Sequence, residues 1–260
     1  MRREVLGLCL AGLLLSAHGG AAQATLSVQG NGTVYDSVQN ISWDQDANAV
    51  KTLCDANDPI WTSFVPGSGR PLSDICASGG DFHWDEAVAW IAHLNANAYK
   101  GITNWRLYST TQPDPTCSAQ TSPGAPYPDQ GFLYGCTGGE LGHMFYKPPP
   151  VGLGNTYGSC GSSCFQNTGP FVNTLQDIYW SGTEYAPDTT NAWEFNVGTG
   201  SQKAFAKQDV TRYAWAVRAG PFAVDIPVTA IPAVGPGGLG LLASLLAGLG
   251  GLRLRRRGRN

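Results

Sequence analysis

Basic residues are scarce in the chain once its two ends are set aside. Between Thr25 and Asp225 there are nine Lys and Arg residues against eighteen Asp and Glu residues, a net charge of about −9, although the whole chain carries only −3. The nine form no cluster, and so acidic a segment repels a polyanion on average. We therefore expect no nucleic-acid partner.

Motifs of common catalytic and metal centres are missing as well. Ser181 lacks the G-x-S-x-G frame of a nucleophilic serine, and no H-E-x-x-H pattern occurs. The aspartates within residues 44–55 lack the spacing of an EF-hand loop. Cys160 and Cys164 are spaced as zinc ligands can be, but no second close pair completes a set of four. The sequence predicts no catalytic residue, no bound metal and no cofactor.

The first hydrophobic segment has the features of a removable signal peptide. Arg2 and Arg3 precede an apolar stretch at residues 5–15, which is too short to span a bilayer. The sequence Ala-Gln-Ala at residues 22–24 fits the cleavage pattern. Residues 1–24 are therefore predicted to be a signal peptide, and the mature exported chain to begin at Thr25.

The second hydrophobic segment predicts a membrane helix near the C-terminus. No charged residue occurs between Ile226 and Leu252, and residues 239–252 are nearly all Leu, Gly and Ala. We take residues 239–252 as the core of a transmembrane helix, after a linker and sorting motif at 226–238. The arginine-rich tail at 253–260 would stay cytoplasmic, so that the preceding domain faces outward. A buried apolar helix with a solvated basic end is the alternative.

Six cysteines remain after signal-peptide removal, and an even number in an exported chain implies three disulfides. Six cysteines allow 15 pairings, among which the sequence does not decide. Pairing of neighbours is our prediction, because each such pair brackets a Gly- and Pro-rich loop. The predicted bonds are Cys54–Cys76, Cys117–Cys136 and Cys160–Cys164.

Residues 25–225 suit a single α+β domain. Residues 33–35 and 41–43 flank a polar turn and predict a β-hairpin. From Trp84, apolar residues recur with the helical period, which predicts one main helix with His93 on its solvated polar face. Residues 113–170 are rich in Gly, Pro, Ser and Cys and predict a long functional loop held by disulfides. Alternating residues between 178 and 218 predict a terminal antiparallel sheet.

Six short sequence blocks follow one another along roughly residues 30–222. They are Ile41–Asp46, Trp84–Ala87, Asn104–Leu107, Glu140–His143, Tyr179–Glu184 and Ala214–Arg218. Taken in order, they resemble the DUF1566 family, which includes the C-terminal domain of a Legionella collagen-like adhesin. The family's usual Trp-Arg-Leu-Pro block has Tyr108 in place of the proline. The resemblance implies a C-type-lectin-like or related α+β fold on a secreted or surface protein.

The C-terminal tail combines a short proline-containing motif, the apolar segment and a run of arginines. Its marking residues are Ile231, Pro232, Pro236, Arg253, Arg255, Arg256 and Arg257. This order resembles a variant PEP-CTERM or IPTL-CTERM sorting signal without the Pro-Glu-Pro core. Such tails are associated with exosortase-type processing enzymes in Gram-negative bacteria. The resemblance implies a chain anchored in the inner membrane before processing, then displayed at the cell surface or secreted; a plain membrane anchor is the alternative.

Arginines beside tryptophans suggest ligand contacts, because Arg binds carboxylates bidentately and Trp stacks on sugars. A structural role is favoured for them, since a Trp at strand spacing is usually core. An arginine such as Arg106 is then usually paired with a carboxylate such as Glu140 or Glu184. The weighed candidates are Trp105, Arg106, Trp180, Glu184, Trp193 and Arg218.

The pattern favours a non-catalytic lectin-like or adhesive domain that recognises a glycan or matrix polymer. The alternative is an enzyme related to the formylglycine-generating enzymes, which share a lectin-like scaffold and need a reactive cysteine. A third possibility is a structural component of an exopolysaccharide matrix.

Overall fold

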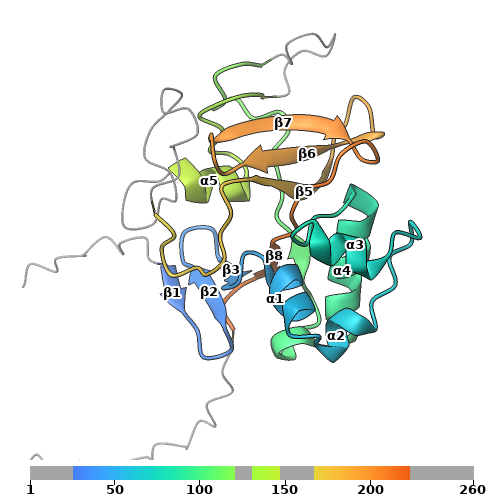
Figure 1. Ribbon diagram of the computed structural model, residues 1–260. Helices are drawn as coiled ribbons and strands as arrows, with labels where there is room; N and C mark the ends of the chain where they lie inside the picture. Colours follow the sequence, from blue (N-terminus) through green and yellow to red (C-terminus); the bar gives the residue numbers. More distant parts are fainter. Residues whose placement is uncertain (1–25, 121–130, 147–166, 223–260) are drawn as a thin grey trace, which may run out of the picture. The chain divides into compact units, whose positions relative to one another are not determined.

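A computed structural model describes residues 26–120, 131–146 and 167–222 of the chain (Figure 1). All of them belong to the first of two compact units, which divide after Phe222. The predicted signal peptide, the linker with its sorting residues, the membrane segment and the arginine tail lie outside the described residues. Among the helices that the structure describes, none combines the length and apolar character needed to cross a membrane.

The described part is α+β with antiparallel strands, as the sequence predicts. The strands form two sheets, however, and the last strand of the terminal sheet predicted from residues 178–218 joins the larger sheet as β8, where it pairs with β3 and β4. The larger sheet has the order β1-β2-β3-β8-β4, and every neighbouring pair is antiparallel. Its strands are β1 (Leu26–Val28), β2 (Thr33–Asp36), β3 (Ile41–Asp44), β4 (Arg106–Leu107) and β8 (Ala216–Ala219). The hairpin predicted from residues 33–43 is confirmed as β2 and β3. The Asp36 carboxylate holds its turn by accepting the Val38 and Gln39 amides.

The second sheet is a meander of three consecutive antiparallel strands, drawn in orange tones in Figure 1. They are β5 (Ile178–Glu184), β6 (Asn191–Asn196) and β7 (Ser201–Ala206). Trp193 and Phe195 on β6 are buried, as their alternation with polar neighbours predicts. Glu194 between them is buried as well. Arg212 pairs with it there, because the Arg212 Nε donates to the Glu194 carboxylate at 2.7 Å.

The predicted main helix is confirmed as α4 (Trp84–Ala96). It begins where the His83 amide donates to the Glu86 carboxylate at 2.9 Å, which satisfies one of the free amides at a helix start. One face buries Ala87, Trp90 and Leu94 in the core. Val88 belongs to the apolar pattern read from the sequence, yet it is 41 % exposed.

Within the described residues, four further α-helices and one 3₁₀ helix, η1 (Tyr99–Gly101), were not predicted. Three lie in the first third of the chain: α1 (Ala49–Asp55), α2 (Pro59–Thr62) and α3 (Leu72–Ala77). The fourth, α5 (Glu140–Tyr146), falls inside the segment that the sequence assigns to a long loop. Each spans two turns or fewer, so its apolar period is too short to read and its stability comes from packing and caps. Asn48 and Asp58 supply two of these caps.

Two of the predicted disulfides lie in the described residues, and both pairings are confirmed. Cys54–Cys76 joins α1 to α3, and Cys117–Cys136 crosslinks the segment before α5. Cys160 and Cys164 lie outside the described residues.

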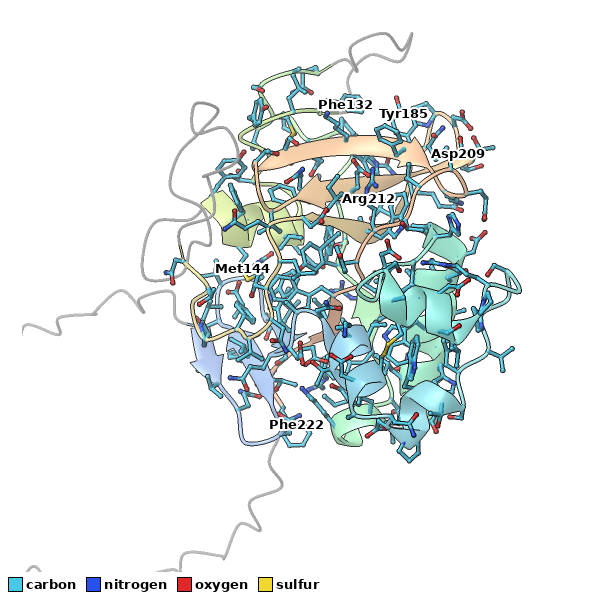
Figure 2. All side chains as sticks on the ribbon, in the orientation of Figure 1. Phe132, Met144, Tyr185, Asp209, Arg212 and Phe222 are labelled. Carbon is cyan, nitrogen blue, oxygen red and sulfur yellow. A yellow bond between two sulfur atoms is a disulfide. The ribbon has the colours of Figure 1, made fainter. Side chains whose placement is uncertain are left out.

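Aromatic side chains fill the core between these elements. Trp43 and Trp215 meet edge to face with ring centroids 5.1 Å apart. On the smaller sheet, Phe132 and Tyr185 pack on Trp193 (Figure 2). Such pairs add about 0.5–1.5 kcal/mol each beyond area burial, so aromatic contacts help to hold the sheets in place.

Candidate functional site

An open groove of about 630 Å³ lies where α4, β4 and β5 meet. The helix contributes Val88, Ile91, Ala92 and Asn95. Residues 105–109 form the second wall, and Gly182 and Thr183 of β5 the third. The exposed lining is mostly apolar, and Asn95, Arg106, Ser109 and Thr183 supply its polar side chains. A concave, largely apolar surface with few polar groups is typical of a ligand site.

The walls of the groove are fixed to one another through hydrogen bonds to the main chain. The Asn95 side-chain amide donates from Nδ2 to the Trp105 carbonyl at 2.9 Å, and its Oδ1 accepts the Trp105 N–H at 2.6 Å, so α4 is joined to the residue that precedes β4. The Gly182 N–H donates to the Tyr108 carbonyl at 2.8 Å, which joins β5 to the same segment. A side chain at Gly182 would crowd the Leu107 Cβ at 3.2 Å, so glycine permits this approach. The groove is therefore pre-formed.

One residue of the groove lining, Arg106, belongs to an arginine–carboxylate pair. It donates from Nη1 and Nη2 to the two oxygens of Glu140, which lies behind the lining residues Arg106 and Ser109, at 2.7 and 2.6 Å. Glu140 also accepts the Ser109 N–H at 2.7 Å, and Arg106 Nη1 donates to the Leu107 carbonyl at 3.1 Å. The predicted pairing with Glu140 is confirmed. The Arg106 side chain is nevertheless 41 % exposed and that of Glu140 16 %, so the pair is open to solvent on one side.

The tryptophans weighed as sugar-stacking residues are core residues. Trp105, Trp180 and Trp193 are all buried. Each indole N–H is satisfied inside the protein: Trp105 by the Tyr99 carbonyl, Trp180 by the Phe82 carbonyl and Trp193 by the Gln112 side chain. The structural role favoured from the sequence is confirmed for these three, and only Trp105 borders the groove.

Glu184 and Arg218 do not line the groove. Glu184 pairs with Lys207, whose Nζ lies 4.2 Å from the centroid of the Trp84 ring. Arg218 donates to the Asn104 side chain at 3.2 Å and to the Pro221 carbonyl at 3.0 Å. Both contacts tie strand ends to neighbouring segments, which is a structural role.

Neither Ser181 nor His93 is placed for nucleophilic catalysis. Ser181 is buried, and its hydroxyl donates to the Tyr108 carbonyl while accepting the Thr183 N–H. His93 Nε2 lies 2.7 Å from the Ile60 carbonyl, so this nitrogen carries the proton and cannot take one from Ser63, 3.4 Å away. His93 is half-buried against Phe64 and Trp90 rather than solvated, which corrects the sequence-based expectation.

The aspartates near residue 50 do not converge on a cation. Asp44 is buried and its carboxylate pairs with Lys100 Nζ at 2.6 Å; burial raises the pKa of Asp44 in spite of that partner. Asp55 pairs with Lys51, and Asp46 accepts the Asn48 amide. Each carboxylate is held by protein donors of its own.

Two cysteine–aspartate groups bring potential ligand atoms close together within the described residues. They are Cys54 with Asp55 and Cys76, and Asp114 with Cys117 and Cys136. In both groups the sulfurs are joined in a disulfide and offer no thiolate to a metal.

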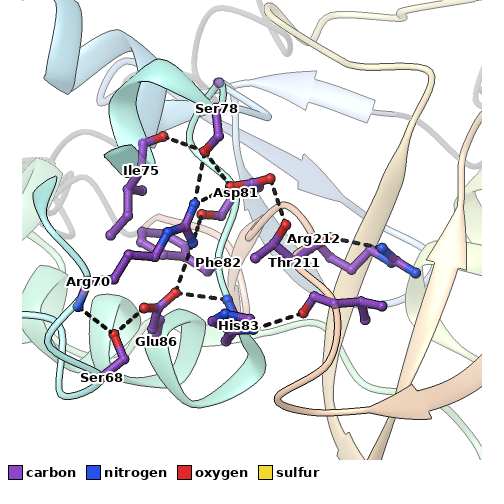
Figure 3. Close-up of polar contacts among 12 residues, drawn as sticks. Ser68, Arg70, Ile75, Ser78, Asp81, Phe82, His83, Glu86, Thr211 and Arg212 are labelled. Carbon is purple, nitrogen blue, oxygen red and sulfur yellow. Dashed lines mark hydrogen bonds and ion pairs between the residues drawn. The ribbon is translucent and has the colours of Figure 1, made fainter. Parts of the chain in front are cut away.

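A second arginine–carboxylate cluster, the Arg70 hub, lies away from the groove and had no signal in the sequence (Figure 3). Arg70 donates to the Asp81 carboxylate at 2.7 Å, to the Asp81 carbonyl at 3.0 Å, to Glu86 at 3.1 Å and to Ser78 at 3.0 Å. Thr211 reaches the other Asp81 oxygen at 2.7 Å. Partial burial raises the pKa of Asp81, but hydrogen bonds from Ser78, Arg70 and Thr211 outweigh it and lower that pKa below its ordinary value.

Fold and site together define an α+β domain with a rigid open groove and a paired arginine beside it. Comparison with protein-family models, with curated proteins and with solved structures found no match.

Proposed function

We propose that this chain is an exported, non-catalytic binding domain that recognises a glycan or matrix polymer through the groove between α4, β4 and β5. The observation that carries the proposal is the pre-formed groove itself. Its walls are clamped by Asn95 and by the β5 contact at Gly182, so little ordering is needed on binding. An open groove can accommodate an internal stretch of a polymer, whereas an enclosed cavity cannot.

The chemistry of the described side chains supports binding rather than catalysis. Ser181 is committed to main-chain hydrogen bonds, and His93 has its proton on the nitrogen that faces Ser63. Cys54, Cys76, Cys117 and Cys136 are all in disulfides. An enzyme of the formylglycine-generating type would need a reactive thiol.

Export and surface display belong to the same proposal. Two disulfides agree with an oxidising compartment, and the predicted signal peptide leads there. We propose a C-type-lectin-like domain of the DUF1566 type, anchored by the C-terminal helix and then released or displayed by an exosortase-type enzyme. The α+β architecture and the order of the resembling sequence blocks support this assignment.

A glycan array probed with the full chain tests the binding role. We expect retention on at least one class of polysaccharide and no turnover of it. Absence of binding to every carbohydrate would count against the proposal. Thiol titration of the folded chain addresses the enzyme alternative, since a thiol of low pKa would favour it.

Protease added to intact spheroplasts tests the topology. An outward-facing domain should be digested, whereas full protection would contradict surface display. A cytoplasmic marker protein that survives the same treatment shows that the membrane stayed closed.

A further inference from the structure

Arg106 keeps two hydrogen-bond donors unused at the groove. A guanidinium has five N–H groups. Nη1 donates one hydrogen to Glu140 and the other to the Leu107 carbonyl, and Nη2 donates one hydrogen to Glu140. Among the described residues, the Nε hydrogen and the outer Nη2 hydrogen have no protein partner. These two form the side-on fork of the guanidinium, which binds a pair of oxygens at once.

Glu140 keeps one acceptor site unused next to that fork. Its Oε2 accepts both Arg106 Nη1 and the Ser109 N–H, whereas its Oε1 accepts only Arg106 Nη2 among the donors of the described residues. A carboxylate oxygen has two lone pairs, so Oε1 can take one more donor. The pair therefore presents donors and an acceptor side by side.

That arrangement fits hydroxyl groups better than anions. A hydroxyl both donates and accepts, so neighbouring hydroxyls can satisfy the Arg106 fork and the Glu140 oxygen together. A carboxylate or sulfate would also face the Glu140 charge, and Glu140 already neutralises Arg106. The acidic balance of residues 25–225 adds a further repulsion.

The rest of the groove complements the apolar side of a sugar ring. Val88 and Ala92 are exposed on α4, and Leu107 lies across from them on β4. Ring C–H groups can lie on such an aliphatic wall while the hydroxyls at the ring edge reach polar groups. The Ser109 main chain is already held by Glu140, and Ser109 is exposed at the rim.

From this complementarity we infer that the groove binds a neutral, hydroxyl-rich polymer. The Arg106–Glu140 pair then forms hydrogen bonds with adjacent hydroxyls of one hexose unit. The inference rests on the proposed function, which leaves the chemical class of the glycan open. Arg106 and Glu140 are then ligand-contacting residues that also hold each other in place.

Titration calorimetry on the full chain, in a detergent without a sugar headgroup, tests this. The probes are oligosaccharides from neutral polymers (dextran, galactomannan, xyloglucan) and from acidic ones (alginate, polygalacturonate). We expect a neutral probe to bind with an affinity that is nearly constant between about 50 and 500 mM salt, because no net charge is neutralised. Glu140→Gln and Arg106→Lys should each weaken binding about tenfold, or about 1.4 kcal/mol. Arg218→Lys, outside the groove, is the matched control and should change nothing.

The outcomes separate this inference from the proposed function. Binding of acidic probes alone, weakened by salt, would overturn the neutral-ligand inference and leave a glycan-binding domain. Neutral binding that all variants share equally would place the ligand elsewhere and overturn it too. Loss of binding to every probe by the parent chain would remove the proposed function itself. Melting curves show whether each variant folds. Should Glu140→Gln unfold, Val88→Arg blocks the groove without removing any hydrogen bond.

Discussion

The Arg70 hub and the Arg106–Glu140 pair both join an arginine to carboxylates, but they differ in burial and in the hydrogen bonds that the arginine makes. In the hub, the Arg70 side chain is 19 % exposed and its partner Glu86 only 1 %. Four hydrogen bonds from Arg70 tie the loop before α3 to the start of α4. Arg106 makes three bonds and remains more than twice as exposed, and its Nε and outer Nη2 hydrogens have no partner in the described part of the chain. A closed cluster serves stability, whereas an open one retains capacity for a ligand.

The largest expected effect is at the hub. Arg70→Ala leaves the buried Glu86 carboxylate without its cation, and breaking a buried pair from one side costs about 3–5 kcal/mol. Urea unfolding of the variant should show a loss of that size in the free energy of unfolding. Lys51→Ala is the control, because its exposed pair with Asp55 contributes at most about 1 kcal/mol. A loss at Arg70 as small as at Lys51 would remove the distinction between the two clusters.

Arg106→Ala should lower the free energy of unfolding less than Arg70→Ala does, but it should weaken binding of the polymer more. Water can reach Glu140 when Arg106 is removed, so we expect a loss of about 1–2 kcal/mol in the free energy of unfolding, within the range for hydrogen bonds to charged groups. Ligand binding should fall beyond detection in the same sample. A stability loss as large as that of Arg70→Ala, with binding intact, would show that Arg106 is only a structural residue.

The Arg106–Glu140 pair and the groove illustrate what this sequence could predict. Arg106 lies between apolar residues, which demands a nearby carboxylate, and Glu140 was one of two named. The β2–β3 hairpin, α4 and two disulfides also followed from local pattern. The groove did not, because it forms only where β5 meets α4 and β4, which lie much earlier in the chain. Asn95 holds two walls of the groove together through its two hydrogen bonds to Trp105, yet its sequence context is that of any polar helix residue.

The hub was missed for a related reason. Ser68 and Arg70 lie in a loop rich in Gly, Pro and Ser before α3, and Ser78 lies just after α3, where no periodicity marks a partner. Asp81, which accepts hydrogen bonds from both Arg70 and Ser78, precedes α4 and has the pattern of an ordinary acidic residue near a helix start. Only the folded chain brings Thr211 to the same carboxylate.

Acid should weaken the hub through Asp81. The pKa of Asp81 is lowered in the folded chain, so its contribution to stability is present above the ordinary value of 3.8 and is lost as pH falls through the lowered pKa. Asp81→Asn should therefore flatten the dependence of unfolding free energy on pH in that acid range. Glu194→Gln is an informative contrast. Burial raises the pKa of Glu194 despite Arg212, so its contribution fades as pH rises through the raised pKa. Equal slopes in Asp81→Asn and the parent chain would contradict this account.

The smallest expected effect on stability, and the clearest separation of the two regions, comes from Val88→Arg. Val88 is 41 % exposed on α4, and arginine favours a helix slightly more than valine does, so the free energy of unfolding should change by no more than about 0.5 kcal/mol. The long side chain would nevertheless occupy the groove beside Ala92 and exclude the polymer. Val38→Arg, at an equally exposed position in the β2–β3 turn, adds the same charge outside the groove and should bind as the parent chain does. Since both variants carry one extra positive charge, a difference between them reports occlusion and not electrostatics. Full binding by Val88→Arg with an unchanged melting temperature would show that the ligand does not use this groove.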